Sequence, residues 1–205
     1  LEYFSAISRI AKFNPKVMVI TGGGEPSLWR EGKLKIYDLI MEIRKHMSDI
    51  PLGIMSNGTF LMPEAAVEQL KWLRVSINSF DRDQYKIVHK LDKFDLVIKN
   101  ITEYAKMNLG ELGIGFVYTQ RTAKDIISAL KTINEKIFSQ LSDKDIKKIN
   151  VQFRPEADPK TYSRHFLDSD LVNELNSQLE NCDIKTQEFA NEKTNLYQVF
   201  NNSVF

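Results

Sequence analysis

A glycine-rich turn is the segment of this sequence best suited to hold a small ligand. The turn, Gly22–Pro26, follows the apolar and β-branched run Lys16–Thr21. Glycines at the carboxyl end of a strand can adopt positive φ and bring bare peptide groups close to a ligand. Glu25 adds an anionic acceptor, which suits an ammonium group. The turn therefore predicts a binding site for a small molecule that carries a positive charge.

The residues of this turn allow two other interpretations. A glycine-rich turn before a helix can cradle phosphate, although Glu25 would repel it and no Lys–Ser/Thr pair of the P-loop kind follows. Alternatively, Glu25 is a residue at a helix N-terminus, where the helix dipole favours a negative charge. The first interpretation predicts a phosphate site, and the second gives Glu25 a structural role only.

The turn must be positioned by strands that alternate with helices. Short β-branched runs predict strands at Lys16–Thr21, Leu52–Ser56, Leu73–Ser79, Gly113–Thr119 and Lys148–Arg154. Apolar stripes of helical period predict helices over Ile36–Met47, Phe94–Ala105, Ile126–Ile137 and Leu171–Leu179. Thr122 is expected to cap the third of these, a short helix is expected over Pro63–Leu70, and Asp81 is expected to cap another. Such alternation is typical of repeated βα units with a mostly parallel sheet.

Side chains in three of the predicted strands alternate between apolar and polar. In Leu73–Ser79, for example, every second residue is Leu, Val or Ile, and the residues between them are Arg74, Ser76 and Asn78. A sheet covered by helices on both faces would be apolar on both. The pattern therefore predicts helices on one face and a partial barrel whose interior is lined for a ligand. A plain amphipathic sheet with a solvated face is the alternative.

Four short strings end successive predicted strands. They are Gly23–Pro26 (GGEP), Ser56–Gly58 (SNG), Ser76–Asn78 (SIN) and Val151–Pro155 (VQFRP). In this order the set resembles the radical S-adenosylmethionine (SAM) enzymes, over roughly Lys16–Pro155. The last string resembles members that carry C-terminal auxiliary-cluster (SPASM-type) domains. The chain departs from the family at Asn78, where Asp is commoner, and at His89-Lys90, where many relatives have Arg-Gly.

The resemblance implies an α/β fold, a partial (βα)6 TIM-like barrel of the radical SAM type that lacks its first strand. Residues 1–188 would form this core, and 189–205 a tail or linker toward a downstream domain. The family's cluster loop, C-x-x-x-C-x-x-C, would precede Leu1, and Cys182 is the only cysteine of the chain. The ligands of the [4Fe-4S] cluster are therefore expected upstream, and no metal site is expected within these residues.

The implied function is the SAM-binding part of an enzyme that cleaves SAM to a 5′-deoxyadenosyl radical for hydrogen abstraction. A peptide or protein substrate is favoured by the VQFRP string alone. We expect the cofactor to be contacted by the turn and by strand ends, namely Gly22, Gly23, Gly24, Glu25, Pro26, Ser56, Asn57, Ser76, Asn78, Gly115, Val117 and Arg154. The rival functions are a cofactor-free or phosphate-binding βα barrel and a non-catalytic barrel scaffold.

Composition limits the remaining classes of function. The 28 basic and 27 acidic side chains give a net charge of +1, which argues against a nucleic-acid or polybasic membrane partner. No run of ~20 apolar residues is present, so no transmembrane helix is expected. A single cysteine excludes an internal disulfide framework and is typical of a reducing cytoplasm. The three histidines, His46, His89 and His165, are not expected to bind metal.

Overall fold

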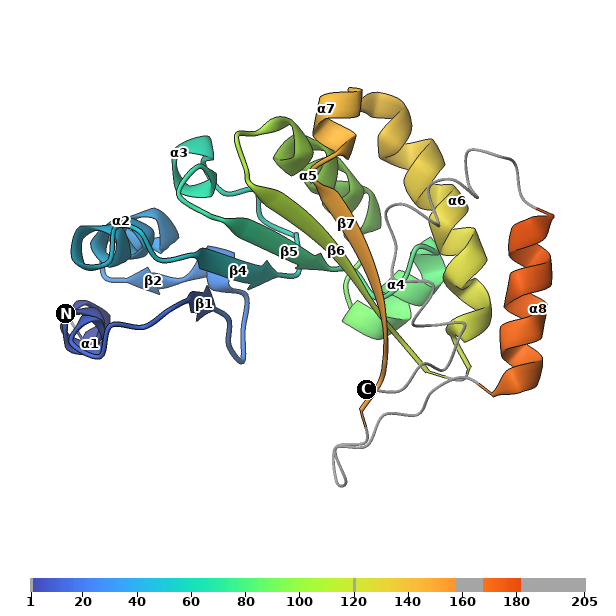
Figure 1. Ribbon diagram of the computed structural model, residues 1–205, viewed down its shortest axis with the longest axis horizontal. Coiled ribbons are helices and arrows are strands. Elements are labelled where there is room, and N and C mark those ends of the chain that lie inside the picture. The colour runs from blue at the N-terminus through green and yellow to red at the C-terminus, as the bar shows by residue number, and fades with distance from the viewer. Residues whose placement is uncertain (1, 120, 158–167, 182–205) are drawn as a thin grey trace.

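The computed structural model of the chain describes residues 2–119, 121–157 and 168–181 (Figure 1). Its central element is a parallel sheet in the order β1-β4-β5-β6-β7. The strands are β1 (Met18–Ile20), β4 (Leu52–Ser56), β5 (Trp72–Ser76), β6 (Glu111–Tyr118) and β7 (Ile149–Pro155). All five predicted strands are confirmed: β4 has its predicted ends, and the ends of the other four are shifted. Cys182, His165 and the tail 189–205 lie outside the described residues.

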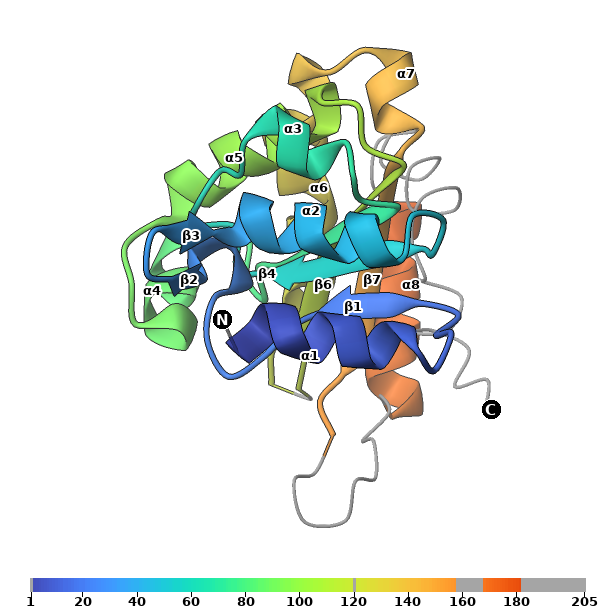
Figure 2. The ribbon, with the colours of Figure 1, turned by 90° about the vertical axis from the view of Figure 1, so that its left-hand side faces the viewer.

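Helices pack on one side of this sheet (Figures 1 and 2). The long ones are α1 (Glu2–Ala11), α2 (Ile36–His46), α5 (Phe94–Lys106), α6 (Ile126–Lys136) and α8 (Ser169–Glu180). Shorter ones are α3 (Glu64–Val67), α4 (Arg82–His89) and α7 (Asp143–Ile146), together with 3-10 turns at Pro26–Leu28, Ala123–Asp125 and Phe138–Gln140. The four predicted apolar stripes lie in α2, α5, α6 and α8, and each of these helices buries part of its stripe.

The two faces of the sheet differ as the alternation predicts. Leu73, Val75 and Ile77 are completely buried against the helices. The opposite face, called the open face below, carries Met55, Trp72, Arg74, Ser76, Gly113, Gly115, Val117, Asn150, Gln152 and Arg154. Val117 on this face is 37% exposed. Burial of apolar side chains against the helices therefore drives folding, whereas the open face is accessible at Val117.

Three predicted helix boundaries are wrong. Thr122 does not cap α6, because its Oγ1 accepts a hydrogen bond from Thr119 N at 2.9 Å and α6 begins only at Ile126. Pro63 is the residue before α3 rather than its first helical residue, and α3 ends at Val67 instead of Leu70. Asp81 does cap α4, since its Oδ1 accepts from Gln84 N at 2.9 Å.

The helix α7 and three elements near the N-terminus were absent from the expectations. The helix α1 lies beside α2 and buries Ile7 (Figure 2). The strands β2 (Arg30–Glu31) and β3 (Leu34–Lys35) form an antiparallel hairpin around Gly32, whose φ of +63° is easily reached by glycine.

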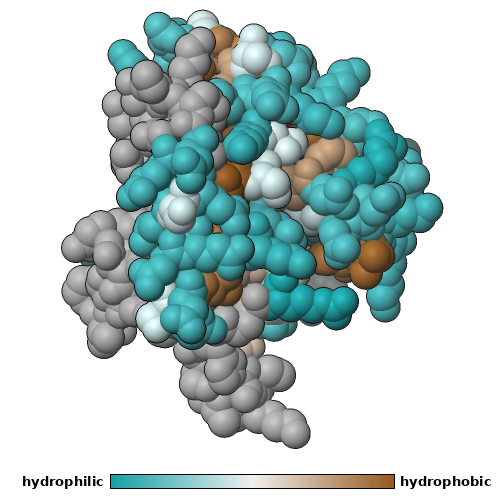
Figure 3. Space-filling model, turned by 90° about the vertical axis from the view of Figure 1, so that its right-hand side faces the viewer, coloured by the Kyte–Doolittle hydropathy of each residue, from teal (hydrophilic) through white to brown (hydrophobic). Residues whose placement is uncertain are grey.

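The surface around α4, α6 and α8 is largely hydrophilic. Figure 3 shows this face, where the apolar areas among the coloured residues are small and separate. None of the helices in the described ranges is long and apolar enough to cross a membrane.

One edge of β1 has no partner strand among the described residues, since β1 pairs only with β4. Met18 N donates to Pro51 O at 3.0 Å, so Met18 points its peptide groups toward β4. Because successive residues of a strand point their peptide groups to opposite sides, those of Val19 lie on the free edge. This edge can accept another strand.

We expect the chain to self-associate through β1, because an unpaired strand edge is a template for association. Val19→Pro removes the N–H on the free edge and leaves the bonds to β4 intact, so it should lower the associated fraction. Sedimentation velocity over a series of protein concentrations measures that fraction. Val19→Thr, which keeps the N–H, is the matched control. Equal association of the two variants, or a monomer at every concentration, would contradict the prediction.

Candidate functional site

The carboxylate of Glu25 joins the glycine turn to the end of β4. Glu25 Oε1 accepts hydrogen bonds from Ser56 Oγ at 2.7 Å, from Ser27 Oγ at 2.5 Å and from Ser27 N at 3.0 Å. Glu25 Oε2 accepts from Asn57 N at 2.6 Å. Ser56 is only 4% exposed, so part of this network is buried. The Glu25 carboxylate therefore connects the GGEP string to the SNG string.

Glu25 also begins a short helix, as the structural interpretation of the turn predicts. It is the N-cap of the 3-10 turn Pro26–Leu28. This role does not use up the carboxylate, because the bonds of the cap are made by Oε1, while Oε2 has two lone pairs of its own. Within the described residues, Oε2 accepts one. A ligand ammonium group could therefore still bind at Oε2 while Oε1 keeps its structural role.

The three glycines of the turn leave open space. A methyl group added at Gly22, Gly23 or Gly24 would meet no atom within 4 Å, and all three residues are exposed. The expected positive φ is wrong for these glycines, because positive φ is found at Gly32 and Gly58 instead. Their value at this position is that they let a ligand approach the backbone closely.

The SNG string forms a tight turn in which glycine is required. Gly58 has φ of +76°, and a methyl group there would lie 2.7 Å from Val75 Cγ1. Ser56 Oγ accepts from Gly58 N at 2.9 Å. Asn57 Oδ1 accepts from Thr59 N at 2.9 Å and from Thr59 Oγ1 at 2.7 Å. Ser56 and Asn57 thus shape the loop that presents Asn57 N to Glu25.

Two buried polar residues of α5, Asn100 and Tyr104, hold this loop through hydrogen bonds. Neither was predicted from the sequence. Asn100 Nδ2 donates to Gly58 O at 2.8 Å. Tyr104 OH donates to Phe60 O at 2.8 Å and accepts from Met62 N at 2.9 Å. Burial raises the pKa of Tyr104 to about 12. Their spacing of four residues, inside an otherwise apolar helix face, is the signal that could have found them.

Asn78 lies after the end of β5 and binds the next strand. Its φ of +54° ends the strand at Ser76, so the prediction that the strand continues to Ser79 is wrong. Asn78 Oδ1 accepts from Val117 N at 3.1 Å. This bond holds the end of β5 against β6, next to Gly115 and Val117, which are also predicted to contact the cofactor.

The register places four predicted contact residues together on the open face. Ser76 pairs with Gly115, and Val117 pairs with Arg154. These pairs lie toward the carboxyl ends of β5, β6 and β7, and Glu25 lies beyond the end of β1. Because all five strands are parallel, their carboxyl ends meet at one edge, where ligands bind in open α/β sheets. The predicted site residues therefore converge on one edge of the sheet.

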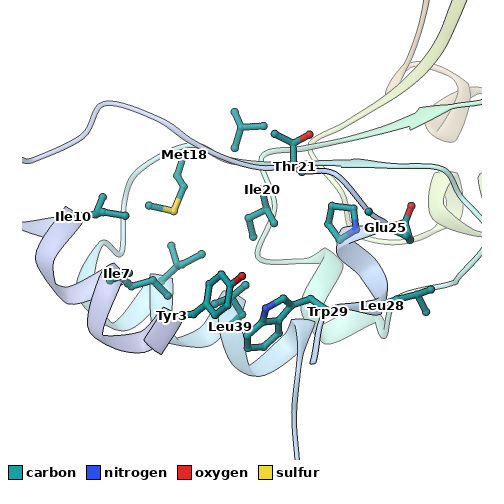
Figure 4. A pocket seen from close by; sticks show the side chains of 16 residues that line it. Tyr3, Ile7, Ile10, Met18, Ile20, Thr21, Glu25, Leu28, Trp29 and Leu39 are labelled. Carbon is teal, nitrogen blue, oxygen red and sulfur yellow. The ribbon is translucent and has the colours of Figure 1, made fainter. Parts of the chain in front are cut away.

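A mainly apolar cavity of about 500 Å³ opens beside the glycine turn (Figure 4). Its walls come from α1, β1, the turn and α2, and include Tyr3, Ile7, Ile10, Met18, Ile20, Gly24, Glu25, Trp29 and Leu39. Figure 4 shows Met18 and Ile20 pointing across the cavity toward Ile7 and Tyr3 of α1. The rings of Tyr3 and Trp29 meet edge to face at 5.5 Å. The cavity thus runs from the glycine turn along β1.

Within 2–119, 121–157 and 168–181, no group of three or more His, Cys, Asp or Glu side chains is arranged so that it could hold a metal ion. His46 Nε2 lies 3.0 Å from Glu42 Oε1, and His89 Nε2 lies 2.6 Å from Ile77 O. These described residues therefore do not fit an iron–sulfur cluster by themselves.

Comparisons with known proteins give one curated relative and a larger number of similar structures, two of which are described below, and no protein-family model matches the chain. The "Probable GTP 3′,8-cyclase" of Pyrococcus abyssi (strain GE5 / Orsay) is 31% identical over 113 residues, which are 52% of this chain and 34% of that protein. The chain thus spans about a third of the length of this relative.

The similar structures both carry bound cofactor. The crystal structure of Streptococcus suis SuiB bound to S-adenosylmethionine matches with a TM-score of 0.55 and 20% identity, over 100% of this chain and 46% of that one. The anSMEcpe structure with bound AdoMet matches with a TM-score of 0.53 and 20% identity, over 96% of this chain and 54% of that one. At this identity the two matches establish a shared fold.

Replacing Glu25 by glutamine should lower the free energy of unfolding by ~1–3 kcal/mol, because the new NH₂ group cannot accept from Ser56 or Asn57. Urea unfolding at pH 7 measures the change. Glu103→Gln is the matched control, since Glu103 makes a surface ion pair with Lys106 at 3.1 Å that is worth at most ~1 kcal/mol. Unchanged stability in Glu25→Gln would show that the network does not hold the turn.

Tyr104 makes a second prediction, on the pH dependence of stability. Its pKa rises from 10.0 to about 12 on folding, so the native state holds this proton more tightly. The stabilisation is complete below pH 10 and is lost as the pH rises toward 12. Tyr104→Phe should reduce that loss, and at pH 7 it should cost ~1–3 kcal/mol by leaving Phe60 O and Met62 N unpaired.

The comparison requires a second tyrosine as control. Burial also raises the pKa of Tyr118 to about 12, so a part of the alkaline loss should remain in Tyr104→Phe. Tyr3 is 53% exposed, and Tyr3→Phe should follow the wild type at every pH. Urea unfolding between pH 9 and pH 11.5 distinguishes these cases, and identical profiles for Tyr104→Phe and wild type would contradict the assignment.

Proposed function

We propose, from the resemblance of this chain to the radical SAM enzymes, which the comparisons support, that it is the SAM-binding part of such an enzyme. The observation that carries the proposal is the convergence of the motif strings at the carboxyl edge of one parallel sheet, where Glu25 joins two of them. The same comparisons favour an enzyme over a non-catalytic barrel scaffold as the parent protein.

The residues at this edge fit the chemical groups of SAM. The free acceptor position of Glu25 Oε2 would take the ammonium group, and the exposed backbone of Gly22–Gly24 would border the methionine part. Ser76 and Asn78 would bind ribose hydroxyls. Val117, which is exposed, would meet the adenine, and Gly115 would border it beneath the Arg74 guanidinium. Arg154, beside Val117, would meet a carboxylate of cofactor or substrate. Ser56 and Asn57 act through Glu25, which they hold in place.

Bound SAM, with a [4Fe-4S] cluster, would supply a 5′-deoxyadenosyl radical that takes a hydrogen atom from the substrate. The cluster does not fit this chain, because Cys182 is its one cysteine and three are needed. We propose that its ligands lie outside these 205 residues. The part played by this chain is to bind SAM, to orient it over the open face and to keep water away from it.

The cavity beside β1 supports an additional strand at the sheet edge. Val19 presents unpaired peptide groups there, and the adjoining walls of about 500 Å³ are mostly apolar. A strand paired with β1 would place alternate side chains between β1 and α1. We propose that this is the first strand of the partial barrel, that residues 1–188 belong to the barrel core and that 189–205 lead to a further domain.

A peptide or protein remains the proposed substrate, supported by the VQFRP string of β7. The observed sheet is compatible with a large substrate, because the open face is formed by five neighbouring strands and is exposed both at Val19 of the edge strand β1 and at Val117 of β6.

SAM binding tests the proposal directly. Val117→Asp places a negative charge on an exposed position where the adenine would lie, so it should weaken SAM binding about tenfold without unfolding the chain, a loss of ~1.4 kcal/mol. Isothermal titration with SAM measures the affinity. Val88→Asp is the matched control, because Val88 is 48% exposed and lies on the helix α4 rather than on the open face. Ser76→Ala should have a smaller effect in the same direction.

Cleavage of SAM is tested in the longer protein that carries the cluster cysteines. After chemical reduction it should convert SAM to 5′-deoxyadenosine, and Val117→Asp should lower the rate at low SAM concentration. Equal affinity in Val117→Asp and Val88→Asp would remove the open face from the cofactor site. Intact SAM after reduction of a cluster-loaded protein would favour the scaffold interpretation instead.

A further inference from the structure

A buried arginine on the open face has no hydrogen-bond partner in the described part of the chain. Arg74 of β5 is 8% exposed, and neither its Nε nor its Nη2 makes a hydrogen bond there. Burial, and then repulsion by Arg154, lowers the pKa of Arg74 to about 10, so the guanidinium remains charged at pH 7. A buried charge without a partner is costly, which indicates that a partner is supplied by another molecule.

The neighbouring strand makes room for this side chain. Gly113 and Gly115 of β6 lie beside Arg74 in the sheet register. A methyl group at Gly115 would lie 2.7 Å from Arg74 Nε, and one at Gly113 would lie 3.3 Å from Arg74 Cγ. The guanidinium therefore lies across β6, in space that side chains larger than glycine at positions 113 and 115 would fill.

Arg74 lines a cavity of about 300 Å³ on the open face. The other walls come from Met55, Trp72, Glu111, Gly113 and Gln152. Asn150, paired with Gly113, has a buried Oδ1 that also lacks a partner. Glu111 makes no ion pair with Arg74 within 4 Å in the described residues. The cavity thus combines a buried cation and the amide side chain of Gln152 with the apolar side chains of Met55 and Trp72, and such a mixture of groups is found in small-molecule sites.

We propose that Arg74 binds an oxyanion group of the substrate, a carboxylate or a phosphate, in this cavity. Arg74 precedes Ser76 by two residues, so it lies about 7 Å along β5 from the proposed ribose contact. The guanidinium presents parallel N–H groups that match both oxyanions. This inference rests on the proposed function, because it takes the open face beside the SAM positions as the substrate side.

Binding of simple anions by the full 205-residue chain tests the proposal. Succinate and inorganic phosphate are titrated separately, with sodium chloride at equal ionic strength as reference, and binding is followed by isothermal titration and by the melting temperature. One of the two anions should stabilise the chain in a saturable way. Arg74→Met should abolish this effect, and Arg74→Lys should weaken it at least threefold. Arg82→Met, which removes an exposed arginine that pairs with Asp92 and Asp95, should bind like the wild type.

The anion-free melting temperature gives an independent result. Arg74→Met removes an unpaired buried charge, so it should melt at or above the temperature of the wild type. A fall of several degrees would overturn the proposal by showing that Arg74 supports the fold. If Arg74→Met does not fold, Gly115→Ala keeps the arginine and displaces its guanidinium, and it should abolish anion binding.

SAM titrated into the same proteins separates this inference from the proposed function. Anion binding that is lost in Arg74→Met supports the inference whether or not SAM binds. SAM binding without any saturable anion binding overturns the inference and leaves the proposed function standing. Equal anion binding in wild type and Arg74→Met also overturns it. A preference for succinate would identify a carboxylate, and a preference for phosphate would identify a phosphoryl group.

Discussion

The hydrogen bonds to the Glu25 carboxylate are the contacts on which the arrangement of the site depends. A single negative charge gathers donors from the turn after β1 and from the loop after β4, which lie about thirty residues apart in the sequence. Charge-assisted hydrogen bonds are roughly twice as strong as neutral ones, so this contact can define a loop that carries three glycines. The loop after β4 is fixed in turn by Asn100 and Tyr104, and the end of β5 by Asn78.

One face of the sheet stabilises the fold, and the other carries the groups that are proposed to bind ligands. On the face that contacts helices, apolar side chains of β5, β6 and β7 are buried, which supplies most of the free energy of folding. On the open face lie small residues and polar groups, among them Arg74 and Asn150 with unmet hydrogen-bonding capacity. Placing such groups away from the main core lets the fold tolerate them, since the cost they impose is offset by packing elsewhere.

Much of this arrangement could be predicted from the sequence, because it depends on local patterns. The β-branched runs predicted the five strands, and the apolar stripes of helical period predicted α2, α5, α6 and α8. Side-chain alternation predicted the open face. Parallel topology then brought Ser76 and Gly115 to one edge. The partners of Glu25 could not be predicted, since they depend on how two distant loops meet. Arg74 was visible as a polar residue, but its lack of a partner depends on β6 and on the cavity beside it. The positive φ of Asn78 likewise follows from its bond to Val117, a tertiary contact.

The placement of the two tryptophans gives each cavity its own optical reporter. Trp29 lines the cavity along β1, and Trp72, whose indole lies over Gly53, lines the cavity of Arg74. The chain contains no other tryptophan. Indole emission responds to the polarity and charge around the ring, so an event in either cavity can change the fluorescence of the chain. With Trp29 replaced by phenylalanine, the remaining signal comes from the Arg74 cavity alone, and the protein can report the occupancy of that cavity in real time without any added label.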